Sequence, residues 1–191
     1  MTTTLTRSYD RYADAKTVVN DLKAAGFADS EISIVANRES DSVMDGVATG
    51  AGVGAAAGGT VGLLTGLGLM AIPGVGPVVA AGWLAATAAG AAAGAAAGGA
   101  AGGIIDAMVD SGVPKDQAHV YAESVRRGGT LVSVRTTDAN RATATAILDR
   151  HRPLDIASRR SAYEAEGWTT FSPTADPYDR AGIDRERGRY L

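Results

Sequence analysis

The sequence predicts an α+β fold: a ferredoxin-like sandwich that is interrupted by a long Gly/Ala-rich helical hairpin and followed by a disordered C-terminal tail. Two flanks, residues 1–40 and 111–158, show the patterns of amphipathic helices and alternating strands. Between them, residues 46–105 hold 18 of the 25 glycines and no charged residue or histidine. Residues 159–191 mix arginine with acidic residues and have no long apolar run. We therefore divide the chain into two halves of one α/β domain, a hairpin at residues 41–110 and a tail.

The first flank has the pattern of a strand, a helix and a second strand. Residues 3–8 are rich in threonine, which favours a half-buried strand. Asp10 is placed to cap a helix that ends at Gly26. This helix has an apolar stripe: Ala15, Val18, Val19 and Leu22. Residues 32–36 form the clearest strand, so this half of the domain is β-α-β.

The second flank has the pattern of a helix, a strand, a helix and a last strand. Pro114 fits the first position of a helix that Gly128 ends. The apolar stripe of this helix is Ala118, Tyr121, Ala122 and Val125. Residues 130–136 alternate as a strand does, Asp138 caps the next helix, and residues 154–157 supply the last strand. One sheet with helices on one face would bury all these stripes together.

The Gly/Ala-rich run is expected to be a hairpin of two helices, at residues 47–72 and 78–105. Closely spaced prolines and glycines break a helix, so the turn lies between the two arms. The expected turn residues are Pro73, Gly74, Gly76 and Pro77. At about 1.5 Å per residue each arm reaches roughly 40 Å, which exceeds the roughly 30 Å hydrocarbon core of a bilayer.

Glycines recur at every fourth position in both arms, which is typical of a glycine zipper. The expected helix-packing residues are Gly46, Gly50, Gly54, Gly58, Gly62 and Gly66 in the first arm, and Gly82, Gly90, Gly94, Gly98 and Gly102 in the second. Each interior glycine costs a helix about 1 kcal/mol relative to alanine. Close packing between backbones must offset that cost. We therefore expect a homo-oligomer that forms through the hairpin.

A lipid bilayer is one of two environments expected for this hairpin. Bulky apolar residues gather near its turn, but residues 85–103 contain nothing larger than threonine. The flanks carry acidic residues such as Asp45 and Asp106, and the usual Lys and Arg anchors are missing close by. We expect a membrane-associated protein whose α/β domain lies in the cytoplasm. The alternative is a cytoplasmic protein whose hairpins pair in solution or in a filament.

Composition and motifs argue against several classes of function. The net charge of -3 does not suit a nucleic-acid partner, and the absence of cysteine with only two histidines does not suit a metal centre. The start shows no secretory signal. Residues 66–71 approximate a dinucleotide fingerprint but follow no predicted strand, so no cofactor is expected. His119, His151, Arg126 and Arg127 fit surface or helix-end positions. No catalytic group of residues stands out, so we expect no enzyme.

The tail holds five of the chain's aromatic residues, and two interpretations stay open. In the first, it is a solvated tail whose first aromatic residues pack back onto the domain. In the second, it is a docking peptide for a protein partner. The residues that would dock are Trp168, Phe171 and Tyr178.

Three sequence blocks carry a resemblance to a known family. They are AAGF…ISIV in the first flank, GVP…A..Y…VRRGGTLVSV in the second, and A..IL..H..LDI at its end. With them, residues 5–178 resemble the heat-induced general-stress protein family, the YflT-like domain. The tail block EAEGWTTFSPTADPYD is similar to aromatic tails of longer members. The resemblance implies a role in bacterial stress responses and no established enzymatic activity.

Together these observations favour a non-enzymatic bacterial general-stress protein. Its glycine-zipper hairpin would insert into a membrane or self-associate, with the α/β domain in the cytosol. One alternative is a pore-like or filament-forming assembly built by the zipper hairpins. The other is an adaptor that recruits a partner through its sheet and aromatic tail.

Overall fold

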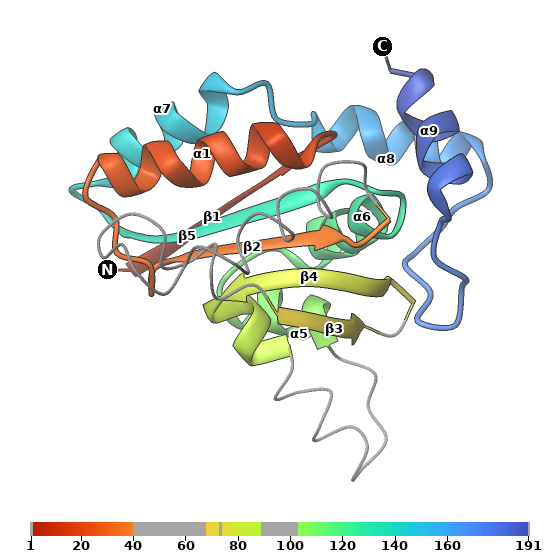
Figure 1. Ribbon diagram of the computed structural model, residues 1–191, viewed down its shortest axis with the longest axis horizontal. Coiled ribbons are helices and arrows are strands. Elements are labelled where there is room, and N and C mark those ends of the chain that lie inside the picture. Colours follow the sequence, from red (N-terminus) through yellow and green to blue (C-terminus); the bar gives the residue numbers. More distant parts are fainter. Residues whose placement is uncertain (1, 40–67, 73, 89–102, 191) are drawn as a thin grey trace, which may run out of the picture.

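The structure, a computed structural model, describes residues 2–39, 68–72, 74–88 and 103–190. These residues form an α+β fold around an antiparallel sheet with the strand order β1-β5-β2-β4-β3 (Figure 1). The strands are β1 (Thr2–Tyr9), β2 (Ile32–Asn37), β3 (Gly68–Ile72), β4 (Gly76–Gly82) and β5 (Thr130–Thr137). The predicted α+β class is confirmed.

Helices cover both faces of this sheet. On one face, α1 (Tyr12–Ala24) and α7 (Arg141–Arg150) pack over a buried apolar cluster with β1, β2 and β5. On the other face lie α5 (Gly103–Asp110) and α6 (Lys115–Arg126). Every residue of β2 is buried, as expected for a strand that is covered on two sides. The prediction of helices on one face only is therefore wrong, and the molecule has three layers.

The ferredoxin-like arrangement is not confirmed, because the strands come from unexpected parts of the chain. α1 connects β1 to β2 along the chain, but in the sheet β5 lies between these two strands. The first flank is therefore a split β-α-β unit. The strand predicted at residues 154–157 does not form, since α8 (Ile156–Ala165) begins there. The Gly/Ala-rich run supplies the remaining strands, β3 and β4, on the far side of β2.

Both helical arms predicted for the Gly/Ala-rich run are wrong where the structure describes strands. β3 falls in the predicted arm 47–72 and β4 in the predicted arm 78–105. The alternating side chains of β4 are buried on both faces of the sheet, with Val78 and Ala80 in one cluster and Val79 and Ala81 in the other. In the described part of the second arm, residues 83–88 and the start of α5 are helical. The rest of both arms lies outside the described residues.

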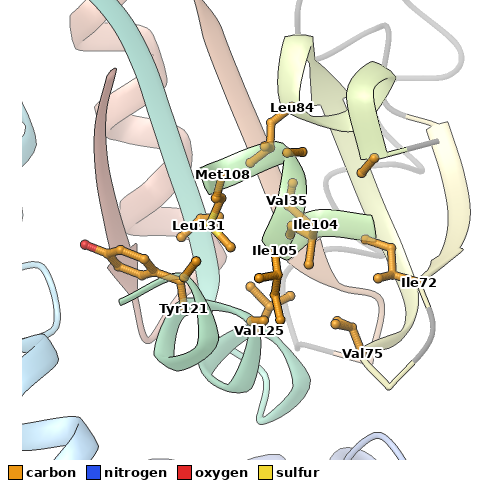
Figure 2. Close-up of a cluster of buried hydrophobic side chains, with 14 of the residues drawn as sticks. Val35, Ile72, Val75, Leu84, Ile104, Ile105, Met108, Tyr121, Val125 and Leu131 are labelled. Atoms are coloured by element: carbon orange, nitrogen blue, oxygen red, sulfur yellow. The ribbon is translucent and has the colours of Figure 1, made fainter. Parts of the chain in front are cut away.

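The apolar residues of the run contribute to the core on the α6 side of the sheet. Figure 2 shows side chains from β3, the turn after it, the helical residues 83–88 and α5 meeting those of α6, β2 and β5. The labelled residues are Val35, Ile72, Val75, Leu84, Ile104, Ile105, Met108, Tyr121, Val125 and Leu131. Among the described helices, none combines the length and hydropathy that crossing a bilayer requires.

The predicted disordered tail is also wrong, because residues 159–190 are built into the fold. They include most of α8 and all of α9 (Arg180–Gly188). Each helix has an aspartate N-cap: Asp155 accepts from the Ser158 amide and Asp179 from the Gly182 amide. Tyr163 and Ile183 are fully buried.

Two predicted caps in the flanks have different outcomes. Gly26 ends α1 with φ +92°, and the Phe27 amide donates to the Leu22 carbonyl, as in a Schellman motif. Asp10 was expected to cap this helix, but Arg11 is the N-cap residue and its side chain makes no capping hydrogen bond. The Asp10 carboxylate instead accepts two hydrogen bonds from Arg159 of α8, at 2.7 and 2.8 Å.

Candidate functional site at the docked C-terminal segment

Of the glycines predicted to pack helices together, the structure describes Gly82, and it lies in a strand. Gly46, Gly50, Gly54, Gly58, Gly62, Gly66, Gly90, Gly94, Gly98 and Gly102 lie outside the described residues. Gly82 ends β4 with φ +88°, and a Cβ there would meet the Ile32 carbonyl oxygen and lie 2.8 Å from Ser33 Cα. It permits a close approach of β4 to β2, so its assignment to helix packing is wrong.

The predicted turn residues connect two strands, and Pro73 among them lies outside the described residues. Gly74 and Gly76 have φ values of +74° and +93°, which glycine tolerates better than other residues. Pro77 is exposed in β4, and its carbonyl accepts a hydrogen bond from the Arg38 amide. The turn therefore lies at the end of the sheet where β2 also ends.

Of the two interpretations of the tail's aromatic residues, the structure agrees with packing back onto the domain. Phe171 is only 7% exposed and joins the apolar cluster of Ile72 and Val75. The Trp168 ring packs edge-on against Tyr163 with centroids 5.9 Å apart. The Tyr178 amide donates to the Arg126 carbonyl at 3.2 Å. We call residues 166–190 the C-terminal segment, and its binding surface is the candidate functional site.

A buried ion network joins this segment to the end of α6. Glu123 is 1% exposed and accepts hydrogen bonds from both Arg126 and Arg127, the latter at 2.6 Å. Arg127 also donates to Glu166 at 2.7 Å and lies 3.4 Å from Glu186 of α9. Two arginines and three carboxylates thus share one partly enclosed site.

Aromatic rings surround the guanidinium groups of this network. The Arg127 guanidinium lies 4.0 Å from the Tyr163 ring centroid and 5.4 Å from that of Tyr178. The Arg126 guanidinium lies 5.1 Å from the Tyr178 ring. Such cation–π contacts are attractive, and they gain strength when the groups are shielded from water. The aromatic residues therefore contribute to the same attachment as the carboxylates.

The pKa shifts in this network keep its groups in the states that the contacts require. Burial lowers the pKa of Arg127, but the hydrogen bond and charge of Glu123 outweigh it, so the pKa is raised overall. Burial raises the pKa of Tyr163, which keeps its hydroxyl neutral beside the network. Near neutral pH, Arg127 is therefore charged and Tyr163 neutral, as these contacts require.

Arg159 forms a second attachment, between α8 and the C-terminal segment. Besides its two hydrogen bonds to Asp10, its guanidinium lies 3.3 Å from the ring centroid of Tyr190. It also lies 4.0 Å from Glu186, which links it to the first network. The end of the segment is therefore held against the end of β1.

The surface hollows nearby are lined mainly by charged and polar side chains. One of about 540 Å³ lies beside α9 and is lined by residues such as Tyr178, Arg185 and Arg189. Another of about 340 Å³ is lined by His119, Arg160 and Trp168, among others. In the part of the chain that the structure describes, no group of three or more acidic, histidine or cysteine side chains could hold a metal ion.

The two histidines make separate structural contacts. His119 Nδ1 lies 3.1 Å from the Thr170 hydroxyl, and burial followed by the charge of Lys115 lowers the pKa of this histidine. His151 follows α7 as its C-cap residue, and its Nε2 lies 2.9 Å from Asp21 of α1. These positions agree with the surface and helix-end roles predicted for them.

Arg126 and Arg127 stand out in the sequence at the end of a helix, but their carboxylate partners do not. The spacing of Glu123 to these arginines, three and four residues along one helix, was the available local signal. Nothing comparable points to Glu186 or Asp10, because their partners are distant in the sequence. Only the fold brings those groups together.

Comparison with known proteins identifies part of the chain. Residues 4–71 match the family described as the heat induced stress protein YflT domain. The match spans β1, α1 and β2 and ends within β3, so it covers less than half of the chain and leaves out α6 and the C-terminal segment. No curated protein and no solved structure matches the chain. The match supports a relationship of this part of the chain to the heat-induced stress proteins.

Proposed function

We propose that this chain is a non-enzymatic general-stress protein that acts by self-association through its Gly/Ala-rich run. The family match supports the stress role. The uncharged run of regularly spaced glycines supports association, because small residues let chain segments approach closely.

One observation favours association between copies over insertion into a membrane. Bulky apolar residues near the middle of the run are buried in the protein's own core, and five of them are Ile72, Val75, Val78, Val79 and Leu84. They are therefore not available to anchor a hairpin in a bilayer. Residues 89–102 consist only of alanine and glycine, which contribute little to insertion.

An adaptor role is the second candidate, and the docked C-terminal segment favours it. The surface around Arg126 and Arg127 binds a short segment that combines the Tyr178 ring with two carboxylates, those of Glu166 and Glu186. A partner of the same chemistry would compete with residues 166–190 for this surface. In this role the protein's own segment is the resident ligand.

The self-association proposal is tested with Gly58, which lies midway along the row of glycines in the run. Native mass spectrometry of the full chain, with and without lipid vesicles, is compared for the wild type, Gly58→Leu and Gly58→Ala. We expect an oligomer that Gly58→Leu disrupts, because leucine cannot fit between closely packed backbones, and that Gly58→Ala weakens less. A wild-type protein that stays monomeric at all concentrations contradicts the proposal. Recovery of the protein bound to the lipid vesicles would favour the membrane alternative instead.

A further inference from the structure

The C-terminal segment lies directly on the turn between β3 and β4. A Cβ on Gly74 would lie 2.5 Å from Pro173 Cα, and one on Gly76 would lie 2.5 Å from Pro177 Cβ. Phe171 inserts beside this turn into the cluster that contains Val75. Figure 1 shows the segment running past the end of the sheet where β4 begins. The turn and the segment are therefore in direct contact, with no room between them for a side chain at Gly74 or Gly76.

The same segment is attached to the end of α6, next to the place where the chain leaves β2. The Arg126 carbonyl accepts hydrogen bonds from both the Tyr178 amide and the Asn37 side chain, each at 3.2 Å. The Arg126 guanidinium donates to the Asp176 carbonyl at 2.9 Å. The C-terminal segment therefore joins β2, the β3–β4 hairpin and α6 at one point.

The chemistry of this attachment favours reversible release. Only Phe171 and Ile183 of the segment bury large apolar side chains in contact with the domain, and Ile183 lies over Gly128. Most other contacts are ion pairs, cation–π contacts and single hydrogen bonds. Buried ion pairs gain little net free energy because their desolvation opposes their attraction. Regions with few apolar contacts open before the rest of a protein unfolds.

We propose that the C-terminal segment is a releasable strap that locks the β3–β4 hairpin onto α6 and thereby restrains self-association through the Gly/Ala-rich run. The second part rests on the proposed function. Release removes Phe171 from the cluster and uncovers Gly74 and Gly76, so the hairpin loses part of its packing and opens more readily from β2. The hairpin forms part of the run itself, so its freedom controls how the run is presented to another copy.

The test compares Phe171→Ala with Thr174→Ala in the full chain by hydrogen–deuterium exchange. Thr174 is the matched control, since it is exposed in the same segment and its hydroxyl contacts only Ser172 among the bonds observed. For Phe171→Ala we expect exchange at least about tenfold faster in residues 68–82 and 168–190, with β5 and α1 unchanged. Thr174→Ala should match the wild type. Faster exchange confined to residues 168–190 would overturn the strap.

A second measurement covers the case in which Phe171→Ala unfolds the whole protein. Exchange of the wild type is followed across low denaturant concentrations. Amides of β3, β4 and the C-terminal segment should share one opening reaction that is distinct from that of β5. Opening of β3 and β4 together with β5 would overturn the proposal.

The proposed restraint of self-association by the C-terminal segment is measured separately. Native mass spectrometry should show a larger oligomer fraction for Phe171→Ala than for Thr174→Ala at equal concentration. An unchanged fraction in a protein that does associate would overturn the restraint. If the hairpin and strap open together but no variant associates, the strap stands and the proposed self-association fails.

Discussion

At the residue scale, Gly82 shows how one backbone position constrains the sheet. It combines a positive φ with close contacts to the Ile32 carbonyl and Ser33 backbone, so a side chain has neither a favourable conformation nor space. Gly26 has a similar φ of +92°, but a Cβ there would have no neighbour within 4 Å. Gly26→Ala should lower the free energy of unfolding by about 1–2 kcal/mol, the cost of the left-handed conformation. Gly82→Ala should cost roughly 1–3 kcal/mol more, through overpacking. Denaturant unfolding of both variants measures the difference, and equal losses would contradict it.

Glu123 is buried and accepts hydrogen bonds from two arginines, Arg126 and Arg127. Glu123→Gln preserves the shape of the side chain but leaves Arg126 and Arg127 with less compensation for their positive charge. Breaking a buried pair in this way typically lowers the free energy of unfolding by about 3–5 kcal/mol. The control is Asp149→Asn, whose pair with Arg7 is partly exposed and should contribute no more than about 1 kcal/mol. Similar midpoints of unfolding for the two variants would show that the network contributes little.

At the element scale, the local signals decided which parts of the fold could be predicted. The stripe from Ala15 to Leu22 corresponds to α1 because the pattern fits the buried face of that helix. Residues 130–136 form β5 as predicted, although its side chains are buried on both faces of the sheet. The glycine spacing pointed to helices in the run, but β4 forms because Val79 and its neighbours pair with β2. That pairing is a tertiary contact, so the spacing of residues within the run does not reveal it. An aspartate such as Asp179 is a local signal for the start of a helix. The burial of Ile183 over Gly128 has no such local signal, because the two residues are distant in the sequence.

The elements drawn from the run lead to a deletion experiment. Joining residue 39 to residue 111 through a Gly/Ser linker removes β3, β4 and α5, together with buried side chains such as Leu84 and Met108. We expect this variant to lose its folded structure, since the α6 face of the sheet would be left uncovered. Replacing residues 46–64 alone by such a linker retains every described element and should preserve the fold. Far-UV circular dichroism and NMR spectra distinguish the outcomes, and a well-folded first variant would show that the run is dispensable.

At the scale of the whole molecule, the two faces of the sheet are closed by different parts of the chain. α1 and α7 cover one face with residues from the two flanks. The other face needs α6 from the second flank, the described strands and helices of the run, and Phe171 from the C-terminal segment. Segments separated by most of the chain length thus meet in one core. This explains why neither flank could be assigned a complete domain from its own sequence pattern.

Buried tyrosines in several layers make the whole molecule sensitive to alkaline pH. Burial raises the pKa of Tyr9, Tyr12, Tyr121 and Tyr163 above the ordinary value of 10.0. A folded-state pKa above the unfolded one means that the neutral phenol stabilises the fold fully below about pH 10. This contribution is lost as the pH rises through the folded-state pKa. The free energy of unfolding should therefore fall steeply above about pH 10, and ionisation of these phenols, followed by absorbance at about 295 nm, should coincide with loss of structure.

Tyr163→Phe isolates one of these groups. The substitution keeps a ring against Arg127 and Trp168 but removes the ionisable hydroxyl. We expect the variant to match the wild type at about pH 8 and to retain more of its stability at about pH 11, because it has one fewer phenol whose ionisation opposes folding. Urea unfolding at the two pH values measures both effects. If all six tyrosines of the wild type ionise near pH 10 while the circular dichroism spectrum stays native, the buried rings are accessible to solvent in the folded state, and burial does not set the alkaline limit.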